Sequence, residues 1–298
     1  MSDGSTLVSV FAEQAASAAA AGDAPAALAA LRQAGADAFA RLGFPTTRDE
    51  DWHYTSPAPI ADSQFVSAFD RTADRLPDAA TLAPYTFGGQ WPLLVFHNGR
   101  FAPQLSSLRA LPDGVRVMPL AQAAIEEPDV LQRFLGQAVA ADRDGFSALN
   151  AAFAGEGTLI HVAKEMVSDT PVHILHVFDA QGAGVMAHPR HLIVVERHAK
   201  ATVLESFIGL DDVSYFTNTV TEVFVEDGAT LTHSRIQRES TSAFHVGTIE
   251  ARQGRDSHFV QFSFQTGARL SRSNVYTCLL YTSPSPRDRT RSRMPSSA

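Results

Sequence analysis

The sequence has 298 residues, a length that favours about two domains over a single small one. Hydrophobic residues make up 45% and charged residues 19%, which is typical of a folded chain and excludes a largely disordered one. The single cysteine, Cys278, excludes a disulfide framework and any multi-cysteine zinc or iron–sulfur site built by this chain alone. The formal net charge of −8 argues against nucleic acid as a partner.

The N-terminal region shows no pattern typical of a targeting segment. A secretory signal has a basic stretch before its apolar core, whereas the first basic residue here is Arg32. The alanine-rich run at residues 15–21 is too short and too weakly apolar to cross a bilayer. We therefore expect a cytoplasmic protein without a membrane partner, and the low cysteine content agrees with this compartment.

Helix-forming residues dominate the first part of the chain. Residues 6–42 are rich in alanine and leucine, which predicts one or two helices, broken near residues 22–25 and ended by Gly43. The features expected next are an irregular stretch at residues 46–90, a strand at 93–96, a hairpin turn at 97–100 and a helical stretch at 118–154.

From about residue 157 the pattern changes to short runs of alternating or β-branched apolar residues. Regularly spaced runs of this kind, with no amphipathic helix between them, predict an all-β sandwich, barrel or solenoid. The runs lie at residues 159–162, 172–178, 191–196, 202–208, 219–225, 230–236, 243–249 and 258–264.

A weak internal repeat bears on the choice among these architectures. Residues 195–199 (Val-Glu-Arg-His-Ala) resemble residues 225–229 (Val-Glu-Asp-Gly-Ala), 30 residues further along the chain. Successive coils of a β-solenoid produce an offset of this size. On the pattern alone, the solenoid remains one alternative beside a sandwich and a cupin-like barrel.

Two histidine pairs, His173 with His176 and His188 with His191, have a spacing that would place both members on one face of a helix. In strands, residues three apart point to opposite faces, so neither pair is arranged to chelate a metal ion. We therefore interpret these residues as packing or surface histidines and predict no metal ligand.

Sequence signatures of catalysis are missing. The chain contains no Gly-x-Ser-x-Gly elbow, no Walker A loop and no strand-following Gly-x-Gly-x-x-Gly, and we predict no catalytic residue. Carboxylates near strands could supply the acid pair of a β-helix polysaccharide lyase or hydrolase, although solvated strand edges explain them more simply. These acidic residues are Glu205, Glu222, Glu226, Asp227 and Glu239.

Residues 48–55 (Arg-Asp-Glu-Asp-Trp-His-Tyr-Thr) form the most distinctive segment. Charged residues leading into two aromatic residues suit an interface, because Trp and Tyr combine a large apolar body with a polar tip. The simpler interpretation, which we favour from the residues alone, is that Trp52 and Tyr54 anchor the N-terminal part onto the rest.

This segment closely resembles an Arg-x-Glu-Asp-Trp-Lys-Tyr-Thr motif of the SufB/SufD family of iron–sulfur cluster assembly proteins, on its SufD branch. Further resemblances to the family follow in the same order and together extend over residues 5–277. They are a hairpin at residues 96–101, a Leu-Asn-x-Ala helix at 148–153, a Pro-hydrophobic-His segment at 170–176, and two later segments at 218–236 and 267–272.

The resemblance implies a mainly β fold with α-helices. Residues 1–154 would form an N-terminal, mainly helical domain with a short hairpin, and residues 155–277 an incomplete right-handed parallel β-helix. It also implies a non-catalytic scaffold, not an enzyme, that works with a SufB-like paralogue and a SufC-like ATPase. The iron–sulfur cluster would be assembled with the partner, and this chain alone would bind no cofactor.

The same resemblance makes five motif residues candidates for an interface. They are Arg48, Glu50, Asp51, Trp52 and Tyr54.

Residues 278–298 depart from the family. They are rich in Ser, Pro and Arg and resemble a translated sequencing adapter, so we interpret them as a non-native, disordered tail. The family's later β-helix coils and C-terminal helical region do not follow residue 277. We therefore carry over no cluster-site residue, and we expect an open solenoid end with poor solubility.

Overall fold

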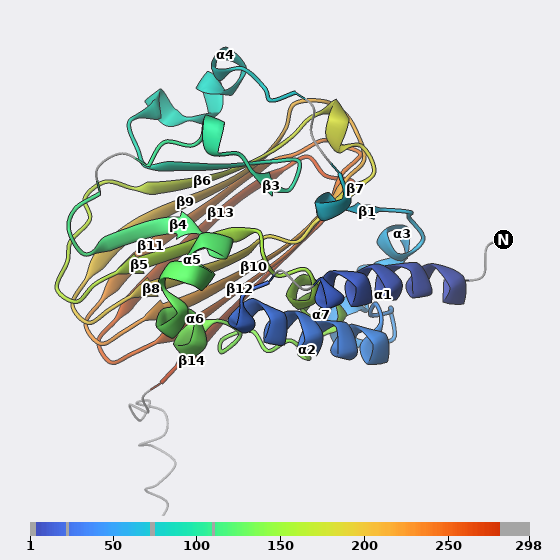
Figure 1. Cartoon of the computed structure of the whole chain (residues 1–298), viewed down its shortest axis with the longest axis horizontal. Coiled ribbons are helices and arrows are strands. Elements are labelled where there is room, and N and C mark those ends of the chain that lie inside the picture. Colours follow the sequence, from blue (N-terminus) through green and yellow to red (C-terminus); the bar gives the residue numbers. More distant parts are fainter. Residues whose placement is uncertain (1–3, 22–23, 72–74, 109–110, 281–298) are drawn as a thin grey trace, which may run out of the picture.

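The computed structural model describes residues 4–21, 24–71, 75–108 and 111–280, which form a two-sheeted β-solenoid with its two longest helices packed on one side (Figure 1). The two long helices, α1 (Gly4–Ala20) and α2 (Ala26–Leu42), confirm the helices expected from residues 6–42. The shorter helices are α3 (Ala58–Ala61), α4 (Ala79–Leu82), α5 (Leu120–Glu126), α6 (Pro128–Phe134) and α7 (Gly145–Ala152).

Strands alternate between the two sheets as the chain advances from residue 157, and this alternation makes about four solenoid turns. The first sheet contains β1 (Val66–Ser67), β4 (Val115–Pro119), β5 (Gly157–Val162), β7 (Val185–Ala187), β8 (Arg190–Val195), β10 (Phe216–Val225), β12 (Phe244–Gln253) and β14 (Leu270–Leu279). The second contains β2 (Leu93–His97), β3 (Arg100–Phe101), β6 (Val172–Phe178), β9 (Lys200–Gly209), β11 (Thr230–Arg238) and β13 (His258–Thr266).

The register of the coils explains the internal repeat. Val225 pairs with Val195 in parallel β10 and β8, and Thr230 pairs with Lys200 in parallel β11 and β9, so one coil separates residues 30 apart. The solenoid alternative is thereby confirmed over the sandwich and the barrel.

The repeated residues include the turns between the sheets. His198 (φ 59°), Gly228 (φ 67°) and Asp256 (φ 55°) occupy the left-handed region in successive coils, where glycine and short polar residues are tolerated best. The turns also stack, because the His198 N–H donates to Asp227 O at 3.0 Å and the Gly228 N–H donates to Arg255 O at 2.8 Å. Backbone demands at these turns thus account for the sequence similarity between coils.

Helices α2, α5, α6 and α7 cover the outer face of the first sheet, whereas α4 packs on the second sheet through Leu82 (Figure 1). Helix α7 is buried between α2 and β10, and its Asn150 Nδ2 donates to Pro189 O at 3.0 Å and to Asn218 O at 2.9 Å. The approach of α2 to α7 requires a glycine, because a Cβ on Gly35 would lie 2.3 Å from Ala152 N. The Leu-Asn-x-Ala segment on α7 therefore joins the helical layer to the solenoid, and we call this segment the clip.

The region before residue 155 contributes more to the sheets than the sequence suggested. Strand β2 pairs in parallel with β6, β1 with β7, and β4 pairs antiparallel with β5, so the N-terminal part completes both sheets. The expected helix over residues 118–154 is wrong as one continuous element. Pro128 begins a new helix, and residues 135–144 form an irregular connection before α7.

Strands β7 and β14 were not expected. Strand β7 occupies one coil position together with β8, interrupted at Pro189, since β10 pairs with both. Strand β14 carries Cys278 and Leu279, paired with Arg252 and Gln253, so the expected disorder does not begin at residue 278. The remainder of the expected tail, residues 281–298, lies outside the described residues. Within the described ranges, no helix combines the length and apolar character needed to span a bilayer.

We expect the purified chain to self-associate, as the sequence already suggested. Within the described residues, β13 and β14 each pair along one side only, and Val260, Phe262 and Phe264 on β13 are at least half exposed. Light scattering after size exclusion at rising concentration should show oligomers, and the Phe262→Lys/Phe264→Lys variant should reduce them. Ile125→Lys, at an exposed position on α5, should not. A monodisperse wild-type sample that melts cooperatively would contradict this expectation.

Candidate functional site

The structure separates the residues of the 48–55 segment. The Trp52 ring is buried, stacks on Phe146 with ring centroids 4.9 Å apart, and receives the Arg272 guanidinium 4.4 Å from its centre. Tyr54, in contrast, is 96% exposed, so the anchoring interpretation holds for Trp52 and is wrong for Tyr54. Arg48, Glu50 and Asp51 are also exposed. Trp52 therefore fixes the segment, while the side chains of residues 48–51, 53 and 54 remain on the surface.

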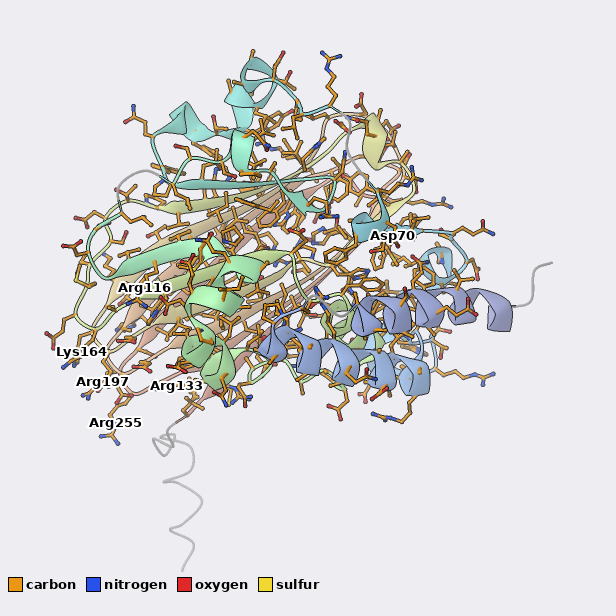
Figure 2. The ribbon with its side chains drawn as sticks, in the orientation of Figure 1. Asp70, Arg116, Arg133, Lys164, Arg197 and Arg255 are labelled. Carbon is orange, nitrogen blue, oxygen red and sulfur yellow. The ribbon has the colours of Figure 1, made fainter. Side chains whose placement is uncertain are left out.

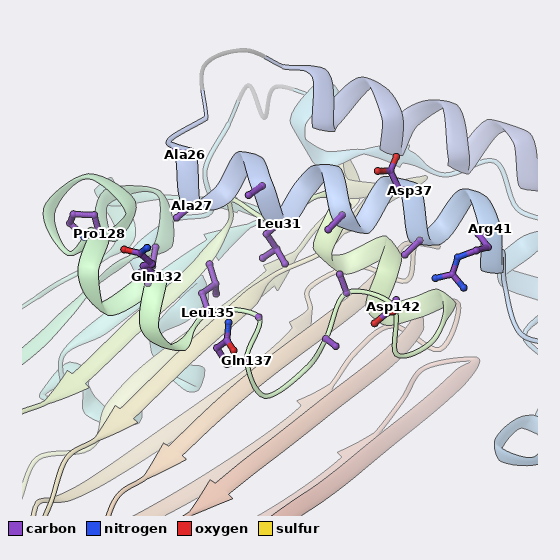
Figure 3. A pocket seen from close by; sticks show the side chains of 17 residues that line it. Ala26, Ala27, Leu31, Asp37, Arg41, Pro128, Gln132, Leu135, Gln137 and Asp142 are labelled. Atoms are coloured by element: carbon purple, nitrogen blue, oxygen red, sulfur yellow. The ribbon is translucent and has the colours of Figure 1, made fainter.

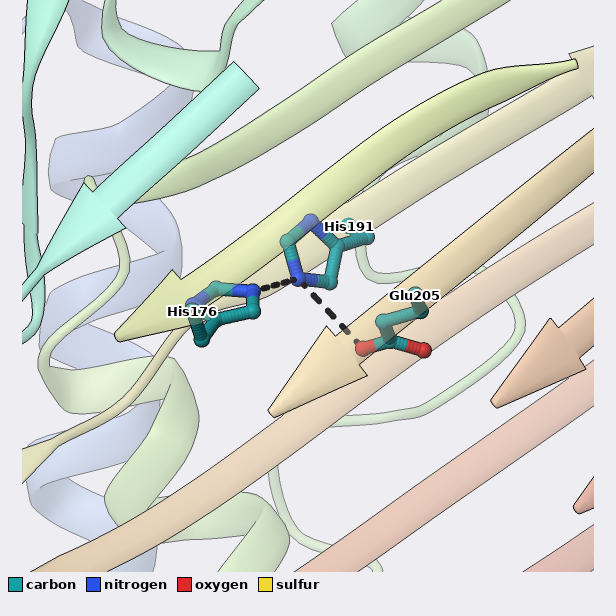
Figure 4. A group of neighbouring side chains, drawn as sticks. All are labelled: His176, His191 and Glu205. Atoms are coloured by element: carbon teal, nitrogen blue, oxygen red, sulfur yellow. Dashed lines mark hydrogen bonds and ion pairs between the residues drawn. The ribbon is translucent and has the colours of Figure 1, made fainter. Parts of the chain in front are cut away.

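A second group of polar and charged side chains lies inside the solenoid. Along the strands, the space between the sheets changes from apolar, at residues such as Val203 and Leu231, to polar. The polar part contains His176, His191 and Glu205 from three different strands, all fully or almost fully buried (Figure 4). The apolar half stabilises the coils by burial, whereas the polar half must satisfy charged groups away from water.

Glu205 is the centre of this cluster. Arg235 donates to its Oε2 from Nε at 3.1 Å and from Nη2 at 3.0 Å, and His233 Nε2 lies 3.2 Å from the same oxygen. Oε1 faces the other way, 3.6 Å from His191 Nε2 and at a long 3.4 Å from the Thr219 hydroxyl. One carboxylate oxygen is thus firmly paired, and the other is weakly occupied.

The two histidines meet through their Nε2 atoms. His176 Nε2 and His191 Nε2 are 3.1 Å apart, so one imidazole donates to the other. The His176 ring lies between Phe96 and Phe207, stacked on both with centroids 4.9 and 4.6 Å away. Packing between two aromatic rings leaves His176 little rotational freedom and aims its Nε2 at His191.

Electrostatics in this interior favour a charged carboxylate beside neutral imidazoles. Burial lowers the pKa of His191 to about 4 and that of His176 well below its ordinary value. Burial alone would raise the pKa of Glu205, but Arg235, His233 and His191 outweigh it and hold that pKa well below its usual range.

Several polar atoms around the cluster have no hydrogen-bond partner among the described residues. Buried polar atoms are ordinarily satisfied, so atoms of this kind mark places where water or an ion is expected. They are His191 Nδ1, His233 Nδ1, Arg235 Nη1 and His245 Nε2.

This cluster cannot be recognised from neighbouring residues along one strand. His173 and His176 do point to opposite faces, as expected, and His173 bonds to Ser206 at 2.9 Å instead. The cluster takes one histidine from each pair, across coils. The 30-residue offset was the available signal, because it already places Glu205 directly beside Arg235.

On the outer face of the first sheet, Arg190 and Glu222 form a second buried ion pair. Arg190 donates to Glu222 Oε1 at 2.9 Å and to Val139 O at 2.8 Å, and both charged side chains are fully buried. Glu222 in turn accepts backbone N–H groups from Gly136 at 2.8 Å and Ala138 at 2.9 Å. This pair fastens the 135–144 connection to the sheet.

The other carboxylates are also dispersed or paired. Glu239 lies inside the solenoid with its Oε2 2.8 Å from His245 Nδ1, while Glu226 bonds to Arg133 at the surface. Asp227 accepts the Arg255 backbone N–H in a turn at 2.7 Å. The expected solvated strand edges are therefore wrong for Glu205, Glu222 and Glu239, which are buried, and all five carboxylates have structural partners rather than forming a lyase or hydrolase pair.

Two further features lie at the surface. Figure 2 shows basic side chains gathered at one end of the solenoid, among which Arg116, Arg133 and Lys164 form ion pairs with Glu127, Glu226 and Glu165. A groove of about 870 Å³ runs between α2 and residues 128–142 (Figure 3). Its lining is mainly alanine and leucine, so it provides apolar surface rather than catalytic groups.

Comparisons with known families match both parts of the chain. The model described as the SufBD protein N-terminal region matches residues 1–174, and that of the SUF system FeS cluster assembly SufBD core domain matches residues 177–282. The core match extends past residue 277, where the resemblance was expected to end. The two matches meet near residue 175.

Similar individual proteins come from several bacteria. An iron–sulfur cluster assembly SufBD family protein of Synechocystis, slr0076, is 31% identical over 252 residues, which cover 82% of this chain and 55% of that protein. The iron–sulfur cluster assembly proteins SufD of Escherichia coli and Bacillus subtilis are each 26% identical, over 80% and 71% of this chain and 53% and 48% of their own lengths. The chain thus spans about half the length of these relatives.

The fold and the comparisons agree. The helical layer, the clip at α7 and the parallel solenoid lie in the order that the two family models follow. The chain belongs to the SufB/SufD family of iron–sulfur cluster assembly proteins.

Proposed function

We propose that this chain acts as a non-catalytic, SufD-like scaffold subunit that joins a SufB-like paralogue and a SufC-like ATPase in the cytoplasm. The observation that carries the proposal is the family match over both regions of the chain, together with two relatives that bear the name SufD. The rigid solenoid, held by long parallel ladders and buried ion pairs, suits a subunit that positions partners.

The division of chemistry between subunits follows from the cysteine content. Iron–sulfur clusters are held by thiolates, and this chain has one cysteine, exposed at Cys278. A cluster assembled here therefore takes thiolates from a partner, and it is the cargo of the assembly rather than a resident cofactor of this chain. The 298-residue sequence likewise contains no Walker A loop, which supports ATP binding by the SufC-like partner.

Co-expression of the tagged full chain with a SufB-like and a SufC-like protein of one organism tests the proposal. We expect all three proteins to elute together at fixed stoichiometry after affinity capture and size exclusion. Three proteins that never copurify, although each is soluble, would contradict the proposed scaffold role.

The exposed part of the 48–55 segment is the proposed contact within such a complex. Tyr54 is almost fully exposed beside Arg48, Glu50 and Asp51, while the buried Trp52 keeps the backbone of the segment fixed. Tyr54→Ala should weaken copurification at least tenfold without changing the melting temperature, since aromatic interface residues carry much of the binding free energy. Ile125→Ala, exposed on α5, is the matched control. Equal copurification of both variants would exclude the segment from the interface.

A further inference from the structure

We propose that His176, His191 and Glu205 form a binding site for a divalent transition-metal ion inside the solenoid, with Zn²⁺, Fe²⁺ or Co²⁺ as the chemical class of ligand. The three residues come from β6, β8 and β9, and their donor atoms lie within 4.8 Å of one another (Figure 4). The inference does not rest on the scaffold role, because it concerns only the interior of this chain.

The spacing of the donor atoms fits a metal ion. Bonds of about 2.0–2.1 Å to a tetrahedral ion place neighbouring donors roughly 3.4 Å apart. His176 Nε2 lies 3.1 Å from His191 Nε2, which lies 3.6 Å from Glu205 Oε1. An ion bound between these three atoms would replace the hydrogen bond between His176 and His191. It would also replace the contact between His191 and Glu205, which is too long to be a hydrogen bond.

The carboxylate is oriented for this role. Arg235 and His233 hold Oε2, which leaves Oε1 turned toward the two imidazoles with only the long contact to Thr219. Partners that fix a ligand through its second oxygen are a regular feature of metal sites. The stacking of His176 between Phe96 and Phe207 orients its imidazole in the same way.

The donor set selects the class of ion. Two imidazole nitrogens and one carboxylate oxygen suit Zn²⁺, Fe²⁺ and Co²⁺, whereas Ca²⁺ and Mg²⁺ prefer oxygen ligands throughout. Imidazole binds metal through an unprotonated nitrogen, and the Nε2 atoms of the two rings face each other at 3.1 Å. The three protein ligands leave a fourth position for a water molecule, and several buried polar atoms of the surrounding side chains have no hydrogen-bond partner among the described residues.

Arg235 sets the strength of binding. Its guanidinium already balances the charge of Glu205, so an ion brings positive charge that this interior does not otherwise compensate. We therefore expect moderate affinity in the wild type and tighter binding in Arg235→Met, in which the ion would replace the lost positive charge.

The experiment uses the full chain with Cys278→Ser, so that no thiolate competes, and Co²⁺ as the probe. Because the site is buried, Co²⁺ is supplied both to the native protein and during refolding, and unbound ion is removed by gel filtration. By at least one of the two loading routes, we expect the parent protein to retain one more Co²⁺ per chain than His176→Gln or His191→Gln. The retained ion should show the ligand-field absorption of four-coordinate Co²⁺. Exposed histidines are the same in all variants, so only the difference is assigned to the site.

His173→Gln is the matched control, because His173 is also buried on β6 but bonds to Ser206 outside the cluster. It should retain Co²⁺ as the parent does. The melting temperature of Arg235→Met should rise more with Co²⁺ than that of the parent. Failure of the parent to retain Co²⁺ by either route, or equal loss in His173→Gln, would overturn the metal site and leave the proposed scaffold function untouched.

Discussion

Replacing Glu222 by glutamine should lower the free energy of unfolding by about 3–5 kcal/mol, the cost of leaving one member of a buried ion pair without its partner. Arg190 and Glu222 are fully buried, and Nη2 of Arg190 lies 2.8 Å from Oε1. The neutral amide cannot balance the guanidinium. Its NH₂ group would also face backbone N–H groups of Gly136 or Ala138, which now donate to the carboxylate.

Urea unfolding followed by circular dichroism measures this effect. Glu226→Gln is the matched control, because Glu226 follows the same strand but pairs with Arg133 at the surface. Exposed pairs contribute about 0–1 kcal/mol, so the control should change little. If Glu222→Gln were as mild as Glu226→Gln, the buried pair would not be what holds the 135–144 connection to the sheet.

The second large effect is a loss of stability in acid. Burial lowers the pKa of His188 to about 3 and that of His173 to about 4, both far below the ordinary value of 6.5. His188 stacks on Phe153 and lies 3.1 Å from Asn218 Nδ2, so its ring is enclosed by the clip region around α7. Folding therefore keeps both imidazoles neutral.

The direction in which stability changes with pH follows from proton linkage. Above pH 6.5 both the folded and the unfolded chain carry these histidines neutral, so their contribution to stability is constant. Below that pH the unfolded chain binds protons that the folded chain cannot. Each of the two histidines therefore lowers the free energy of unfolding by about 1.4 kcal/mol per pH unit, until the pH reaches the pKa of that histidine in the folded chain. By pH 4, His173 and His188 should each have lowered the free energy of unfolding by about 3 kcal/mol.

Urea unfolding at several pH values between 7 and 4.5 checks this expectation. In His188→Gln the slope of the unfolding free energy against pH should fall by about 1.4 kcal/mol per pH unit, whatever the variant costs at pH 7. His258→Gln, at an exposed position, should keep the parental slope. A chain equally stable at pH 7 and 4.5 would show that these histidines are already protonated or reached by water in the folded state.

Local patterns in the sequence were sufficient for much of the fold. Alanine-rich helices, alternating strands and left-handed turns depend on neighbouring residues, so α1, α2 and the strands from β5 to β13, with the exception of β7, follow from the residues themselves. The 30-residue repeat is also local in origin, because each coil must turn in the same way at His198 and Gly228. The family resemblance rested on the same kind of signal, an ordered series of short motifs.

Other features were decided only when distant segments met. Strands β1 and β4 are short and become strands because β7 and β5 present backbone groups to pair with. Trp52 and Tyr54 are two residues apart, and only the position of Phe146 and Arg272 determines that one is buried and the other exposed.

The interior cluster is the clearest example of a feature that was decided only when distant segments met. His176, His191 and Glu205 each come from their own strand, and their separations of 15 and 14 residues are too long for any period of a single strand to relate them. They converge because the coils stack in register and inward positions of successive strands share one narrow space. The sequence by itself determined which residues point inward, through the two-residue period of a strand. The tertiary structure decided which inward residues face one another, because that depends on the register between coils and on the distance between the two sheets.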